Sequence, residues 1–188
     1  MLLQKETTRR KFLIGSLLAL PLGEMVFKGL TAAQAAEMAA PELTEYQPIF
    51  FSSDEWQFIL AACDSLIPAG GKGKAPGALE TNVPIFIDQQ IHGDSGDEIY
   101  MKGPFDAHAP ATIGYQIPFR PQQIYKTGIK LANQWCQQNH QKPFHQLSAQ
   151  DKDSVLTQLQ KNDIKFADLG EPDLKASQFF SGLLADTK

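Results

Sequence analysis

The chain has 188 residues, of which 43% are hydrophobic and 20% are charged. This length is typical of one domain, and this composition excludes a fully disordered or fibrous protein. The net charge of −4 is unevenly placed: residues 1–35 hold five basic and two acidic residues, and the remainder holds 12 basic and 19 acidic residues. An acidic body argues against nucleic acid as a partner, because phosphate binding requires clustered Lys and Arg. No apolar run reaches the ~18 residues of an ordinary membrane-spanning helix.

The N-terminus has the features of a secretory signal. A basic start is followed by an apolar run over residues 12–23, and an exit of small residues contains Ala33-Gln34-Ala35. This order predicts a signal peptide over residues 1–35 that is cleaved before Ala36. A retained membrane anchor is an alternative, although the apolar run has about half the length that spans a bilayer.

The basic start points to one export route. Arg9 and Arg10 are adjacent, and Phe12 and Leu13 follow after one residue. This pattern resembles a twin-arginine signal, although Ile14 stands where lysine is usual. The alternative is a general secretion signal that happens to contain two arginines.

The remaining residues predict a tether over residues 36–51 and a helical domain over residues 52–188. The first helix is expected over residues 53–66, because Ser52 is a good N-cap and Glu55 completes a capping box. Phe51 and Trp56 stand at the positions of a hydrophobic staple. Residues 69–77 are rich in Gly and Lys but lack the P-loop pattern, so a surface loop is expected there.

Helical periodicity and capping residues predict four further helices. The second starts near Pro84, with Thr81 or Asn82 as cap, and the longest spans residues 121–138. The next is capped by Ser148, and the last covers residues 174–184. No segment combines strand alternation with a hairpin turn, so the prediction is an all-α single domain of about five helices with a long irregular loop. The inward faces are expected to carry Val83, Phe86, Ile87 and Ile91, then Ile124, Gly128, Leu131 and Trp135, then Val155, Leu156 and Leu159, and finally Phe179, Phe180, Leu183 and Leu184.

Residues 92–119 form the long loop, which is rich in Gly, Pro and aromatic residues. A loop of this length in a compact domain is usually functional or bound to a partner. We therefore expect its aromatic side chains to contact another subunit, since such anchors often dominate interface energy. The alternative is that these rings cover the domain's own core. The residues are Tyr100, Phe105, Tyr115 and Phe119.

No motif in the sequence predicts catalysis, a metal site or a bound cofactor. His140 and His145 lack metal-ligand spacing on a helix, and no Cys-x-x-Cys, G-x-G-x-x-G or G-x-S-x-G occurs. Cys63 and Cys136 lie on the expected buried sides of two helices. In an oxidising compartment they are candidates for a disulfide, and two buried thiols or a bridge to a partner are the alternatives.

Four pieces of the sequence, taken in order, resemble the gluconate 2-dehydrogenase subunit 3 family. Together they cover nearly all of residues 52–188. The given sequence ends at Lys188, before the Gly-, Phe- and Tyr-rich tail that is usual there, as expected either of a fragment or of a naturally short member. The pieces are Asp64-Ser-Leu-Ile-Pro68, Pro76-Gly77-Ala78 with Val83-Pro-Ile-Phe86-Ile87-Asp88, Tyr100-Met-Lys-Gly103-Pro104-Phe105, and Gly114-Tyr115-Gln116 with Tyr125 and Gly128.

This resemblance implies a non-catalytic small subunit of a periplasmic, membrane-associated dehydrogenase. Its partners would be a large FAD-binding subunit that oxidises a sugar or sugar acid, a cytochrome c subunit with haem c, and the twin-arginine translocase. The small subunit would assist maturation and export of the flavoprotein. Two other interpretations remain: a free-standing periplasmic binding or chaperone module, and an exported enzyme that uses loop carboxylates with His92 or His108.

Overall fold

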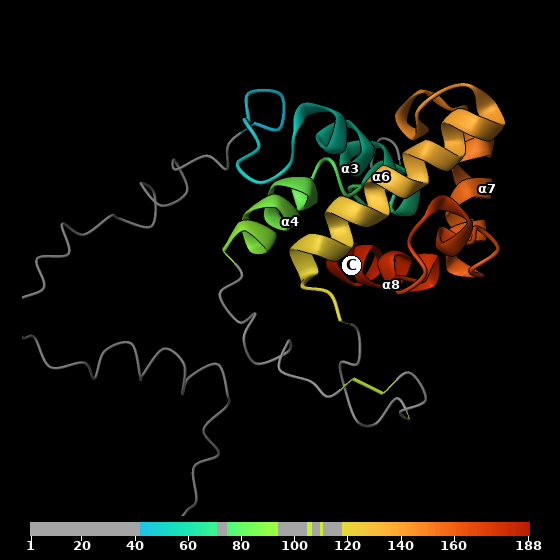
Figure 1. Cartoon of the computed structure of the whole chain (residues 1–188). Coiled ribbons are helices and arrows are strands. Elements are labelled where there is room, and N and C mark those ends of the chain that lie inside the picture. The colour runs from blue at the N-terminus through green and yellow to red at the C-terminus, as the bar shows by residue number, and fades with distance from the viewer. Residues whose placement is uncertain (1–41, 71–74, 94–104, 107–109, 111–117) are drawn as a thin grey trace, which may run out of the picture. The chain divides into compact units, whose positions relative to one another are not determined.

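A computed structural model of the chain describes residues 42–70, 75–93, 105–106, 110 and 118–188 (Figure 1). The chain divides into two units, residues 1–39 and 40–188, and every described residue belongs to the second. Within the described residues there are five α-helices and two short 3₁₀ helices but no strand, which confirms the all-α prediction. The elements are α3 (Ser53–Leu66), α4 (Val83–His92), α6 (Pro121–His140), η2 (Phe144–Gln146), α7 (Ala149–Gln160), η3 (Phe166–Leu169) and α8 (Ala176–Thr187).

Two helices begin where local capping chemistry predicts. Helix α3 starts after Ser52, whose hydroxyl accepts a hydrogen bond from the Glu55 amide while the Glu55 carboxylate accepts one from the Ser52 amide, at 2.8 Å. Helix α7 starts after Ser148, whose hydroxyl accepts from the amide of Asp151 at 3.2 Å. Each bond satisfies a backbone donor that has no partner within its own helix.

Like α3, helix α8 contacts each of the other four described helices. Its Phe179 is fully buried, and the Phe179 ring lies 6.0 Å from the Phe58 ring and 6.2 Å from the Tyr125 ring, measured between centroids. Helix α6 approaches closely at Gly128, where an added Cβ would lie 2.3 Å from the Phe179 ring. The absence of a side chain at residue 128 therefore allows α6 and α8 to meet.

The predicted inward faces are correct for α7, whereas those of α4 and α6 need correction. Phe86 was expected inside, but it is 55% exposed, and Ile85 is buried in its place. Helix α4 is rotated in this way because Asp88 points inward and is fully buried. On α6, Trp135 is only partly buried, and the buried side is broader than the predicted stripe; it includes Tyr125, Ile129, Ala132 and Cys136.

No helix in the described ranges is both long enough and apolar enough to cross a membrane.

Candidate functional site

The most elaborate polar structure in the described residues is centred on Asp88. Its buried carboxylate accepts hydrogen bonds from the Tyr46 hydroxyl and the Ile49 amide, both at 2.8 Å, and from the amides of Phe50 and Phe51, both at 3.0 Å. We call these five residues the carboxylate latch. Both carboxylate oxygens are used, so the charge is satisfied without water.

The latch corrects the prediction that residues 36–51 form a tether. Residues 46–51 are hydrogen-bonded to α4, Phe51 is 3% exposed, and Leu43 packs against the core. These contacts join segments about 40 residues apart, so local composition could not reveal them. The part of the predicted tether that the structure describes is therefore an integral part of the domain.

Lys126 on α6 also contacts Phe50, a residue of the latch, and Glu55 on α3. Its ammonium group donates to the Phe50 carbonyl at 3.0 Å, forms an ion pair with Glu55 and lies 4.6 Å from the centroid of the Phe50 ring. Burial alone would raise the pKa of Glu55, but hydrogen bonds from Lys126 and from Ser52 outweigh it and lower that pKa. Lys126 thus links α6 to α3 and to the segment that the latch holds.

Beside the latch, residues 43–51 and α3 line a groove of about 530 Å³. The Tyr46 and Trp56 rings lie 5.6 Å apart, and both residues line the groove. Burial and the neighbouring Asp88 carboxylate raise the pKa of Tyr46 to about 12. The Tyr46 phenol therefore keeps its proton at neutral pH and donates a hydrogen bond to Asp88, so its observed role is structural.

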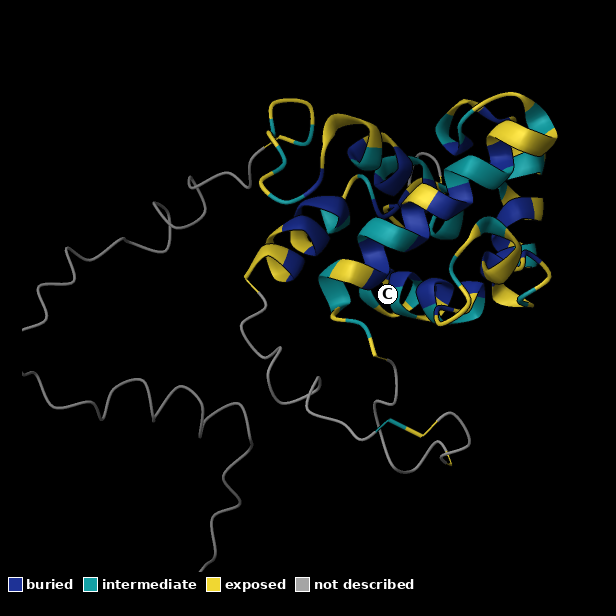
Figure 2. Ribbon diagram, viewed as in Figure 1, coloured by how far each residue is buried: buried dark blue, intermediate teal, exposed yellow. Residues whose placement is uncertain are grey.

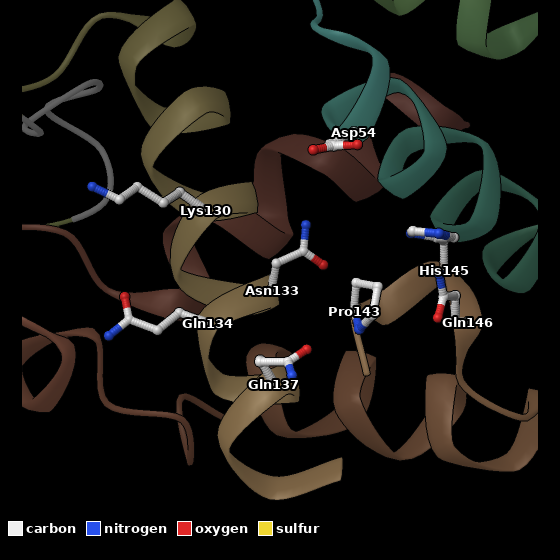
Figure 3. A pocket seen from close by; sticks show the side chains of 8 residues that line it. All are labelled: Asp54, Lys130, Asn133, Gln134, Gln137, Pro143, His145 and Gln146. Atoms are coloured by element: carbon white, nitrogen blue, oxygen red, sulfur yellow. The ribbon is translucent and has the colours of Figure 1, made fainter. Parts of the chain in front are cut away.

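A second hollow, of about 550 Å³, lies where α6, η2 and the start of α3 meet (Figure 3). Nearly all its lining residues are polar: Asp54, Lys130, Asn133, Gln134, Gln137, His145 and Gln146, with Pro143 as the exception. Asn133 Oδ1 accepts from the Phe144 amide, and the buried Nδ1 of His145 has no hydrogen-bond partner. Sequence periodicity did not predict this hollow, because its residues come from three separate elements.

Cys63 and Cys136 are free and buried in the structure, which corresponds to the alternative of two thiols and not to a disulfide. Burial raises the pKa of each thiol to about 12, so neither is an activated nucleophile at neutral pH. The sulfur of Cys63 lies 3.8 Å from the Thr187 hydroxyl, at the end of α8. Nearby, the Tyr125 hydroxyl donates to Asp186 at 2.6 Å.

The sequence-predicted site residues are only partly within the described ranges. Phe105 and Phe119 are partly buried, and Phe119 packs against the core. His92 is exposed at the end of α4. Outside the described residues lie Arg9, Arg10, Phe12, Leu13, Tyr100, Tyr115 and His108.

The structure brings two of the resemblance-bearing sequence pieces together at the base of the Gly/Lys loop. The Ala78 amide donates to the Ile67 carbonyl at 2.9 Å, and the Gly70 amide donates to the Ala75 carbonyl at 3.2 Å. A Cβ at Gly77 would lie 2.5 Å from the backbone nitrogen of Ala69. The backbone segments at residues 69 and 77 therefore approach this closely only because residue 77 is glycine. This closure places the Ile67-Pro68 and Pro76-Gly77-Ala78 pieces side by side.

No group of three or more potential metal-binding side chains (His, Cys, Asp or Glu) gathers within the described part of the chain. The described features define an all-helical domain in which the buried Asp88 carboxylate holds residues 46–51 against α4. At the family level, residues 53–188 match gluconate 2-dehydrogenase subunit 3. This match covers more than half of the sequence, and the chain belongs to that family. Comparisons with curated proteins and with solved structures found no match.

Proposed function

We propose that this chain is the non-catalytic small subunit of a periplasmic, membrane-associated FAD-dependent gluconate or sugar dehydrogenase. The observation that supports it most directly is the family match over residues 53–188, because the family's name implies one subunit of a multi-subunit gluconate dehydrogenase. The partners are a large FAD-binding subunit, which carries the chemistry, and a cytochrome c subunit, which carries haem c. This chain itself binds no cofactor.

The proposed contribution of this subunit is maturation and export of the flavoprotein. Arg9, Arg10, Phe12 and Leu13 support use of the twin-arginine translocase. That route carries folded proteins, and a flavoprotein binds FAD as it folds. A small helical domain without a cofactor has no need of such a route for itself, so the signal serves the folded partner bound to it. Binding only the folded partner also stabilises that partner by mass action.

Purification of the intact complex tests the subunit assignment. The chain, carrying a C-terminal tag, is isolated from detergent-solubilised membranes of the native host. We expect stoichiometric amounts of a flavoprotein and a haem protein, seen as FAD absorbance and a reduced-minus-oxidised haem spectrum, together with acceptor-linked gluconate or sugar dehydrogenase activity. Purification of the chain alone, from membranes that retain this activity, would refute the assignment.

Export is tested separately with the double variant Arg9→Lys and Arg10→Lys, which keeps the charge of the signal. A general secretion signal depends on charge and tolerates this change, whereas a twin-arginine signal does not. We expect both this chain and an active flavoprotein to remain in the cytoplasm. Lys28→Arg is the matched control, since it also exchanges one basic residue for another but lies outside the motif. A flavoprotein that still reaches the periplasm would disprove the carrier role alone.

A further inference from the structure

We propose that the polar hollow between α3, α6 and η2 binds a small polyhydroxylated molecule of the sugar class. This inference goes beyond the proposed function, which assigns no ligand to this chain, and it does not depend on that function. The hollow measures about 550 Å³, within the roughly 300–1,000 Å³ that is usual for small-molecule sites. Its lining comes from three separate elements, so polar groups converge on it from several directions (Figure 3).

A buried nitrogen atom first singles out this hollow. His145 lines it, and its Nδ1 atom is buried and has no hydrogen-bond partner. No other buried side-chain nitrogen or oxygen is in this state among the residues that the structure describes. About nine in ten buried polar groups in proteins have a partner, so this exception calls for an explanation. A hydroxyl group in the hollow would satisfy Nδ1 as acceptor or as donor, whichever tautomer the imidazole adopts.

Asn133 presents an oriented amide group to the same hollow. Its Oδ1 accepts from the Phe144 amide at 3.0 Å, which leaves its NH₂ group to donate elsewhere. Phe144 is fully buried, and its ring centroid lies 4.6 Å from that of Phe58, so the short turn that carries His145 is anchored in the core. Groups that are held in place before binding lose little conformational freedom when a ligand arrives.

Burial of the lining residues indicates the class of ligand. The polar side chains that are partly buried carry amide or imidazole groups: Asn133, Gln134 and His145. The two residues of opposite charge, Asp54 and Lys130, are both exposed, so water screens their charges. An amide group both donates and accepts hydrogen bonds, as a hydroxyl group does. A molecule with several hydroxyl groups therefore matches this lining, whereas an apolar ligand would leave the amides unpaired.

The orientation of the side chains divides the lining into two parts. In Figure 3 the amide groups of Asn133 and Gln137 are turned toward His145. The Lys130 side chain extends in the opposite direction. Exposed and partly buried residues alternate with buried ones along α6, and the hollow lies where the solvent side of this helix meets η2 (Figure 2). We therefore expect the hydroxyl groups to contact the amides and His145, and only an added carboxylate to contact Lys130.

Nuclear magnetic resonance of the ¹⁵N-labelled full chain tests the proposal. The imidazole nitrogen signals of His145 are followed while glucose, gluconate or succinate is added, and those of His92, which is exposed on α4, are the internal control. We expect glucose and gluconate to shift the His145 signals saturably, with a dissociation constant on the order of 1 mM or tighter, and to leave His92 unchanged. Tighter binding of gluconate than of glucose would assign a carboxylate contact to Lys130. Succinate has carboxylates but no hydroxyl group, so it should have no such effect. The absence of a saturable shift with both glucose and gluconate, or an equal shift with succinate, would overturn the proposal.

Variants of α6 provide the second test. Asn133→Asp removes the NH₂ donor but keeps an oxygen that accepts from the Phe144 amide, and Gln138→Glu adds the same charge at an exposed position outside the hollow. We expect only Asn133→Asp to weaken glucose binding, by about fivefold, which is the effect of one hydrogen bond. Gln137→Ala changes an exposed lining residue, so it should fold normally and also weaken binding. Unchanged affinity in Gln137→Ala would overturn the site even if Asn133→Asp fails to fold. The binding measurement uses this chain alone, so its result is independent of whether a flavoprotein co-purifies.

Discussion

Replacement of Asp88 is the most direct test of how residues 46–51 are held against α4. In Asp88→Ala the acceptors for four hydrogen bonds are lost, and the Phe51 amide is left in a buried position. Asp88→Asn removes less, because its single amide oxygen still accepts from Phe50 and Phe51. Its NH₂ group then faces the Ile49 amide, donor against donor. The two variants therefore form a graded series at one position.

The expected magnitudes follow from the number of donors that lose their acceptor. A buried unsatisfied donor costs about 1–3 kcal/mol, and hydrogen bonds to a charged group contribute about 1.5–3 kcal/mol each. The donors other than the Phe51 amide are only partly buried, so water replaces part of the lost interaction. We expect about 3–5 kcal/mol of destabilisation for Asp88→Ala and about 1–3 kcal/mol for Asp88→Asn. The larger value is a substantial fraction of the roughly 5–15 kcal/mol that stabilises a typical domain.

Urea unfolding followed by tryptophan fluorescence measures these changes. Trp56 is a suitable reporter, because it is 6% exposed and its ring lies 5.6 Å from that of Tyr46, a member of the latch. Asp153→Asn is the matched control, since Asp153 is exposed on α7, and it should shift the free energy of unfolding by less than about 0.5 kcal/mol. If Asp88→Ala costs no more than this control, the latch does not hold the N-terminal segment and our account of residues 46–51 is wrong.

Three further predictions concern other parts of the domain. Gly128→Ala should destabilise the domain by about 1–3 kcal/mol, because the added Cβ clashes with Phe179. Gly182→Ala is the control: open space surrounds its Cβ, so it should stabilise the domain by up to about 1 kcal/mol. Equal effects of the two variants in thermal melts would contradict the close crossing of α6 and α8. Glu55→Gln keeps the capping geometry but loses the ion pair, which should cost less than about 1 kcal/mol. Because the pKa of Glu55 is lowered on folding, this difference should be present at neutral pH and vanish as the pH falls through that lowered pKa; a difference that persists at acid pH would count against it. Thiol counting without reductant should find two alkylatable cysteines in the denatured exported protein and almost none in the native protein; none in the denatured protein would mean that a disulfide forms.

Features that depend on neighbouring residues could be predicted from the sequence. The starts of α3 and α7 are examples, because the Ser52–Glu55 and Ser148–Asp151 pairs satisfy backbone donors three residues away. The inward face of α7 was also correct, since its apolar residues follow a regular helical period. In each case the interacting groups lie within one or two turns of a single helix.

Features that depend on distant residues could not be predicted in this way. A lone Asp in an apolar helix gives no indication that it accepts hydrogen bonds from residues 37 to 42 positions away. Once Asp88 is known to point inward, the exposure of Phe86 follows from the rotation of α4. Similarly, the groove beside Tyr46 and the polar hollow beside His145 exist only where separate elements meet. The error on the tether had the same origin, because its partner lies on another helix.

The latch also sets a geometric condition on the proposed carrier role. The predicted cleavage position at Ala36 and the first latch residue, Tyr46, are ten residues apart in sequence. A fully extended chain covers at most about 3.6 Å per residue, so those ten residues span no more than about 36 Å. Until cleavage, the signal is therefore tethered within that distance of Tyr46. Such proximity suits a subunit that presents one signal for two folded chains, since the translocase would engage the signal beside the protein that it must carry.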